Sequence, residues 1–134
     1  MIRIRRLLKD KRGIAAVEFA LVLPVLLLLI FGIIEMGSAW YYRQMMVNAS
    51  REGARLGALS STTGTGDVTS HVSNILTEAG FPGSFSVSAS GVGGSTGTLV
   101  TVQVDSDYEF PVLSALIPAI GSVTLQAVTV MRHE

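Results

Sequence analysis

Residues 19–34 read FALVLPVLLLLIFGII, an uncharged run that lies between Glu18 and Glu35. Thirteen of these 16 residues are Leu, Ile, Val or Phe. Extended back to Ile14, the run is long enough for a helix that rises about 1.5 Å per residue to cross a hydrocarbon core of about 30 Å. The insertion free energies of the apolar side chains, about −0.3 to −0.6 kcal/mol each, outweigh the cost of Glu18 near one end. The run therefore predicts a membrane-spanning helix over 14–35, and a helix buried in a soluble core is the weaker alternative.

The charges on the two sides of this run are unequal. Residues 1–12 hold six basic residues and one acid, whereas the remainder of the chain holds four basic residues and nine acids. The formal net charge of zero therefore divides into +5 and −5. Because Lys and Arg are enriched on cytoplasmic flanks, we expect a single-pass membrane protein, which in a bacterium would lie in the inner (cytoplasmic) membrane. Its N-terminus is predicted to be cytoplasmic and residues 36–134 periplasmic or extracellular.

Composition excludes several classes of protein. A chain of 134 residues is too short for two sizeable domains. The absence of cysteine excludes a disulfide scaffold, a thiol nucleophile and a cysteine-ligated metal. Basic charge confined to one end, beside an apolar run, argues against a nucleic-acid-binding protein. His71 and His133 stand apart from any cluster of ligand side chains, so the sequence predicts no metal site.

No arrangement of residues indicates catalysis. The glycine-rich stretch 91–97 lacks the Gly-Lys-Ser/Thr ending of a phosphate loop and lies between two expected strands, which favours a hairpin loop. Asp105, Asp107 and Glu109 share one face of an expected strand, and we interpret them as a solvated strand end rather than a cation site. The sequence therefore predicts a protein that is not an enzyme, with no cofactor and no small-molecule substrate.

The helix is expected to continue beyond the membrane. No proline and no cluster of loop residues separates Ile34 from Ala58, which predicts one helix from about Gly13 to Leu59. Its part at 36–59 is amphipathic and suited to covering a sheet. One stripe of this part is polar: Gln44, Asn48, Arg51 and Arg55. The opposite side holds Met45, Met46, Ala49, Gly53 and Leu56.

Two groups of residues on this helix have more than one interpretation. Arg51 and Arg55 form a solvated stripe on the simplest interpretation; contacts with neighbouring subunits or with acids of their own domain are the alternative. Trp40, Tyr41 and Tyr42 follow the span at the depth of the lipid headgroups and are typical of an interfacial aromatic belt. Packing against the domain is the competing explanation for these aromatic side chains.

Residues 60–134 predict a small domain. A loop at 60–67 precedes a helix from Val68 to Ala79 with Gly80 as its C-terminal cap. Alternating apolar residues then predict three strands, at 85–89, 100–104 and 123–131. The connection at 110–118, before the last strand, is expected to contain a short helical turn. The expected fold class is α+β, in which a long N-terminal helix is followed by a domain with one helix and a roughly three-stranded antiparallel sheet.

The N-terminus has three possible fates. A secretory signal cleaved after Gly37-Ser38-Ala39 would release a soluble chain that starts at Trp40, but its apolar region is longer than such signals have. A twin-arginine signal at Arg5-Arg6 is weaker still, because nothing in the chain requires folded export. An uncleaved anchor is the second fate, and cleavage after Gly13 is the third.

Glu18 favours the third fate. A carboxylate inside an apolar segment is costly, so it is expected to have a function and a partner. Cleavage after Gly13 would create an α-amine at Ile14, and this amine can pair with Glu18 of a neighbouring subunit. The same cut would remove the basic leader at 1–13, which holds the N-terminus at the cytoplasmic face.

The segment Gly13-Ile14-Ala-Ala-Val-Glu18-Phe19 resembles the prepilin-peptidase motif of type IV pilins, in particular of the Tad/Flp tight-adherence branch. The block from Arg51 to Arg55, REGAR, is similar to that of TadE-like minor pilins, or pseudopilins. The resemblance covers residues 11–58. It implies cleavage between Gly13 and Ile14 by a membrane aspartyl prepilin peptidase, and participation of Glu18 and Phe19 in assembly.

The resemblance also implies a function and partners. The partners are other Tad/Flp pilins and the pilus assembly machinery, and the role is a structural one in a pilus used for adhesion and biofilm formation. The expected organisation is a leader at 1–13, a span at 14–35, an amphipathic continuation at 36–59 and an exposed domain at 60–134. A secreted or anchored extracytoplasmic binding domain without a pilus role remains the alternative.

Overall fold

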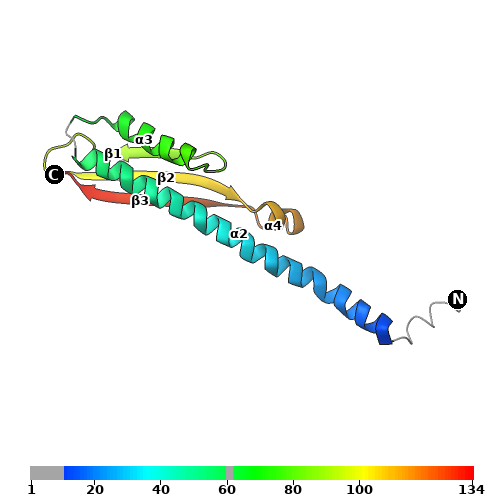
Figure 1. The fold of residues 1–134 in the computed structure, drawn as a ribbon. Coiled ribbons are helices and arrows are strands. Elements are labelled where there is room, and N and C mark those ends of the chain that lie inside the picture. Colours follow the sequence, from blue (N-terminus) through cyan, green and yellow to red (C-terminus); the bar gives the residue numbers. More distant parts are fainter. Residues whose placement is uncertain (1–10, 60–61) are drawn as a thin grey trace.

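The structure is a computed structural model that describes residues 11–59 and 62–134, so the predicted leader at 1–13 lies almost entirely outside the described residues. Figure 1 shows one long helix that projects far beyond a small head made by the other elements. In chain order these are α2 (Lys11–Leu59), α3 (Thr65–Glu78), β1 (Ser86–Ser90), β2 (Leu99–Glu109), α4 (Pro111–Leu116) and β3 (Ser122–Arg132). The α+β fold class is as predicted.

Helix α2 is unbroken over 49 residues, or roughly 73 Å at 1.5 Å per residue. Pro24 lies inside it, in the half that projects from the head. In the other half the polar stripe is exposed, while Met46 and Ala49 are fully buried. One half of α2 is therefore a free apolar stalk and the other half is part of the head.

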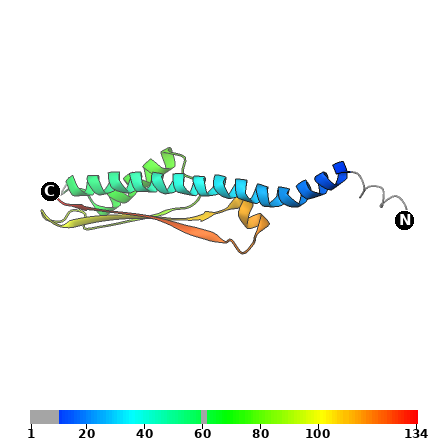
Figure 2. The same cartoon turned by 90° about the horizontal axis from the view of Figure 1, so that it is seen from below.

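The head has two layers, seen edge-on in Figure 2. The three strands form an antiparallel meander in the order β1-β2-β3. Helix α2 packs over β2 and β3, and α3 packs beside α2 and over β1. The core between these layers consists of small and branched side chains, with Val68, Val72 and Leu76 from α3, Val100, Val102 and Val104 from β2, and Leu125 and Ala127 from β3.

The boundaries differ from the expected ones in two places. Helix α3 begins at Thr65 rather than Val68, because the Asp67 carboxylate accepts a hydrogen bond of 2.9 Å from the Gly64 N–H and stabilises the first turn. Strand β2 runs on to Glu109, since it stays paired with β3 as far as Ser122. The acidic run at 105–109 therefore forms the end of this strand, on the uncovered face of the sheet, where Asp107 and Glu109 are exposed, in agreement with a solvated strand end.

Gly53 allows α2 and α3 to approach closely, which leads to a first prediction. A Cβ at Gly53 would overlap Cγ2 of Val72 and lie 3.5 Å from Cγ1 of Val68. Because valine is stiff about χ1, Gly53→Ala is expected to lower the free energy of unfolding by about 1–3 kcal/mol. Chemical denaturation of the full chain in detergent measures this loss.

The matched control is Gly66→Ala, because a Cβ at Gly66 meets no atom within 4 Å. This control is expected to leave the stability unchanged or to raise it by less than about 1 kcal/mol. Equal stability of Gly53→Ala and the wild type would contradict the close contact between the two helices.

Candidate functional site

The projecting half of α2 carries the predicted processing and assembly residues. Gly13 and Ile14 lie in the first turns of the helix, followed one turn later by Glu18 and Phe19. Glu18 is exposed, as is Phe19 at 60%. Among the side chains described, those of residues 13–59 and 62–134, none forms a hydrogen bond or ion pair with Glu18. The head of the same chain therefore offers this carboxylate no counter-charge.

Beyond Glu18, from Phe19 to Ile34, the surface of this stalk is apolar on every side. In the described part of the chain, α2 is the one helix long and apolar enough to cross a membrane, and none of its most apolar stretch is buried in the structure. Leu21 is 73% exposed and Val25 is 69% exposed. A continuous apolar surface of this kind requires a bilayer or the apolar surface of other subunits.

The arginine block lies at the far end of α2, on the side turned away from the sheet. Arg51 and Arg55 are both exposed. Arg55 lies 3.6 Å from Glu52 on its own helix, and both side chains are at least half exposed, so this ion pair contributes little to stability. In the isolated chain, Arg51 and Arg55 are therefore exposed to solvent. Contacts of these arginines with neighbouring subunits stay a prediction.

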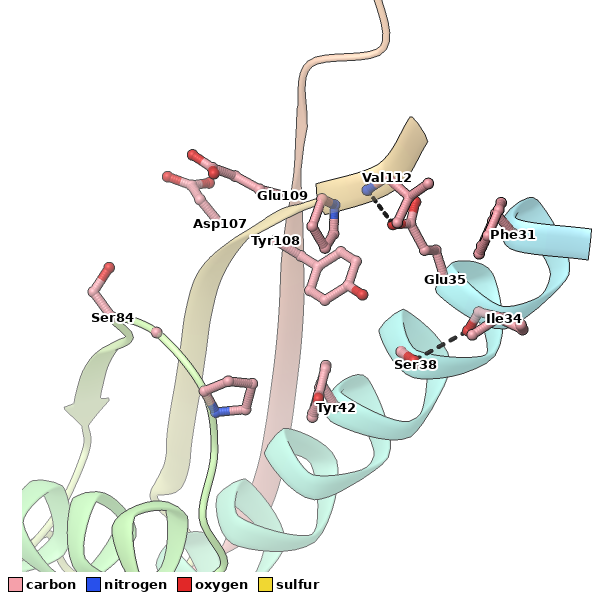
Figure 3. Close-up of a pocket in the computed structure, with 13 residues that line it drawn as sticks. Phe31, Ile34, Glu35, Ser38, Tyr42, Ser84, Asp107, Tyr108, Glu109 and Val112 are labelled. Carbon is pink, nitrogen blue, oxygen red and sulfur yellow. Dashed lines mark hydrogen bonds between the residues drawn. The ribbon is translucent and has the colours of Figure 1, made fainter. Parts of the chain in front are cut away.

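Glu35 forms the junction between the stalk and the head. Its side chain is only 5% exposed, although it follows directly after the apolar run. Its Oε1 accepts a hydrogen bond of 2.6 Å from the Val112 N–H (Figure 3). Its Oε2 accepts one of 3.1 Å from the Leu113 N–H. These N–H groups lie in the first turn of α4, where helical donors have no partner within the helix. A carboxylate there satisfies two donors and complements the helix dipole.

The membrane stalk, the exposed Glu18 and the arginine block all fall within one stretch of the chain. Residues 13–55 match the TadE-like protein family. The chain carries a TadE-like domain. The match includes Glu35 and ends four residues before the end of α2, so that it leaves out the sheet. TadE-like proteins are pilin-like and generally non-catalytic. No curated protein and no solved structure matches the chain.

The aromatic residues of the TadE-like domain point in different directions. Tyr42 packs inward, with its ring centroid 5.7 Å from those of Phe81 and Tyr108. Trp40 and Tyr41 are 63% and 61% exposed. Tyr42 therefore packs against the domain. An interfacial position stays a prediction for Trp40 and Tyr41.

Tyr108 lies between the TadE-like domain and α4 (Figure 3). Burial raises the pKa of its hydroxyl above the usual 10.0, and the charges of Tyr42 and Glu35 raise it further against an opposing hydrogen bond with Ser38. The hydroxyl is therefore protonated throughout the physiological pH range. It provides a neutral polar group beside the Glu35 carboxylate.

An open groove of about 860 Å³ separates the TadE-like domain from the end of the sheet. Phe31, Ile34 and Ser38 line it from α2, and Pro82, Tyr108 and Val112 line it from the head. Its lining contains carboxylates and hydroxyls but no His, Lys or Arg that would act as a base or hold an anion. Among residues 11–59 and 62–134, no three potential ligand side chains gather to hold a metal ion.

The candidate signal-peptidase site lies inside the TadE-like domain, in an unbroken helix. Ala39 is only 5% exposed, and Ser38 donates a hydrogen bond of 3.0 Å to the carbonyl of Ile34. Cleavage after Ala39 would also separate Glu35 from the α4 amides that it binds. This arrangement is unfavourable for release of a soluble chain that starts at Trp40.

The sequence reasoning placed Glu35 at the edge of the span and assigned it no contact. One signal was present, because Phe110-Pro111 begins a helix without a Ser, Thr, Asp or Asn cap. A helix start without a local cap needs an acceptor from elsewhere in the chain. Sequence alone does not say which distant residue provides it.

Proposed function

We propose that this chain is a membrane-anchored minor pilin, or pseudopilin, that takes part in assembling a Tad/Flp-type pilus. Its role is structural rather than catalytic. The proposal is carried by one observation: an exposed carboxylate, Glu18, lies on a free apolar helix five residues after Gly13 and has no partner among the described residues of its own chain.

Cleavage after Gly13 would give Glu18 a partner. Ile14 and Glu18 are four residues apart, about 6 Å along the helix axis. If a neighbouring stalk is shifted by about one turn, its new α-amine at Ile14 lies beside the Glu18 carboxylate. In the apolar interior of a bundle of stalks, an unpaired carboxylate is strongly unfavourable, whereas a paired one is tolerated. This requirement would favour one axial stagger between subunits.

The proposed partners are those that the resemblance to TadE-like minor pilins implies. A membrane prepilin peptidase makes the cut between Gly13 and Ile14, and other pilins of the system provide the neighbouring stalks. The lipid bilayer holds the stalk at 14–35 before assembly, with the N-terminus in the cytoplasm. The exposed head then meets the other components of the assembly machinery.

Determining the N-terminus of the protein from its native host tests this proposal. Mass spectrometry of the intact membrane-extracted chain is expected to show a start at Ile14, and a host that lacks the prepilin peptidase is expected to retain the leader. A start at Trp40 would replace the pilus role by secretion. A retained Met1 in both hosts would leave an unprocessed membrane anchor.

A further inference from the structure

The connection between β2 and β3 contains an unusual apolar surface. Residues 110–121 read FPVLSALIPAIG and include no charged side chain. Phe110 at its start is buried, but none of the α4 residues that follow is buried. Leu116 is 56% exposed, and the apolar side chains of 117 and 120 are partly exposed. The most apolar connection in the head is therefore displayed on its surface.

The position of this segment is fixed relative to the membrane span. Glu35, the first residue after the uncharged run, holds the first turn of α4 through Val112 and Leu113. The first turn of α4 therefore lies level with the outer end of the span. Figures 1 and 2 both show α4 at the end of the sheet that faces the N-terminal half of α2, with the connection extending toward the stalk.

Several backbone N–H groups of the segment have hydrogen-bond partners within the protein. Glu35 accepts from the first two free donors of α4, and Pro111 and Pro118 have no N–H. Further N–H groups bond within the segment, as Ser114 does to Phe110 O (2.9 Å), Ile117 to Leu113 O (2.7 Å) and Ile120 to Ile117 O (2.9 Å). A segment can enter a membrane, where water is scarce, only if its backbone N–H groups are hydrogen-bonded within the protein.

We propose that residues 111–120 form a second membrane contact, which enters the interface of the outer leaflet beside the stalk. The occupant of the exposed apolar surface is the phospholipid bilayer, because Glu35 holds α4 beside the outer end of the apolar span. The head would thus be attached to the membrane at two points, α2 and α4, and would have a fixed orientation on it. This inference rests on anchoring by α2 and is independent of the pilus role.

The absence of native cysteine makes the depth of α4 directly measurable. The full chain with Leu116→Cys is labelled with an environment-sensitive fluorophore and placed, one copy per disc, in nanodiscs of phosphatidylethanolamine and phosphatidylglycerol. We expect a blue-shifted emission, quenching by lipids that carry a nitroxide near the headgroup, and loss of quenching by an aqueous nickel chelate. Ile120→Cys is expected to give the same result.

Val130→Cys is the matched control, since Val130 is an apolar side chain of similar exposure, 52% against 56%, near the opposite end of the sheet. Its label is expected to be quenched by the aqueous chelate and not by the lipids. Aqueous quenching at Leu116 equal to that at Val130 would overturn the proposal. Protection of Leu116 from both quenchers would also overturn it, because protein rather than lipid would then cover α4. Neither result depends on pilus assembly.

Discussion

Replacement of Glu18 by alanine is expected to abolish pili while the protein remains in the membrane. Removal of the carboxylate makes the span more apolar, so insertion is favoured. The same change removes the acceptor for the Ile14 amine of the neighbouring stalk, and that amine then has no partner in an apolar bundle. The measurements are pilus counts by electron microscopy and the fraction of the protein in the membrane, in a strain that carries the variant as its single copy.

Two variants make this experiment specific. Glu18→Gln keeps the size and hydrogen-bonding capacity of the side chain but removes its charge, so it is also expected to lose pili if ion pairing is the function. Glu78→Ala removes an exposed carboxylate from α3, away from the stalk and from the arginine block, and we expect normal piliation. Normal piliation of Glu18→Ala would show that Glu18 has no part in assembly.

The second large effect is expected for Glu35→Ala. The substitution removes both acceptors of the Val112 and Leu113 amides, and hydrogen bonds to a charged group contribute about 1.5–3 kcal/mol. Because water regains access to part of the site, we expect the free energy of unfolding to fall by about 2–3 kcal/mol. Denaturation of the full chain in detergent measures the loss, and hydrogen exchange locates it at the α4 amides.

Matched variants separate this contact from a general loss of charge. Glu35→Gln retains one acceptor oxygen and is expected to give an intermediate loss, with faster exchange at one of the two amides. Glu52→Ala breaks an exposed pair and is expected to change the stability by less than about 0.5 kcal/mol. Unchanged exchange at Val112 and Leu113 in Glu35→Ala would contradict the role of Glu35 at the junction.

The elements that could be predicted from sequence are those with local signals. The apolar run predicts the stalk, and alternation of valines at 100, 102 and 104 predicts a strand buried on one face. The start of α3 was missed because Asp67 reads as a loop residue when its bond to the Gly64 N–H is not known. Boundaries of this kind depend on a single hydrogen bond, which composition does not reveal.

The junction could not be predicted, because its partners are distant in the chain. Glu35 and Val112 are separated by 77 residues, and their contact depends on the length of the sheet between them. The different orientations of Trp40, Tyr41 and Tyr42 could have been predicted, because consecutive residues of a helix point in directions about 100° apart. Tyr42 therefore faces the core while Trp40 and Tyr41 do not, so the three residues need separate interpretations.

The unbroken course of α2 has a mechanical consequence. A pull on the head passes along a single rod to the membrane, and the bond between Glu35 and α4 prevents the head from swinging about that rod. Pro24 lacks the N–H that would brace the preceding turn, so bending under load concentrates there. The compliant point of the rod thus lies eleven residues before Glu35, within the predicted span, and the outer part transmits tension and torque as one stiff piece.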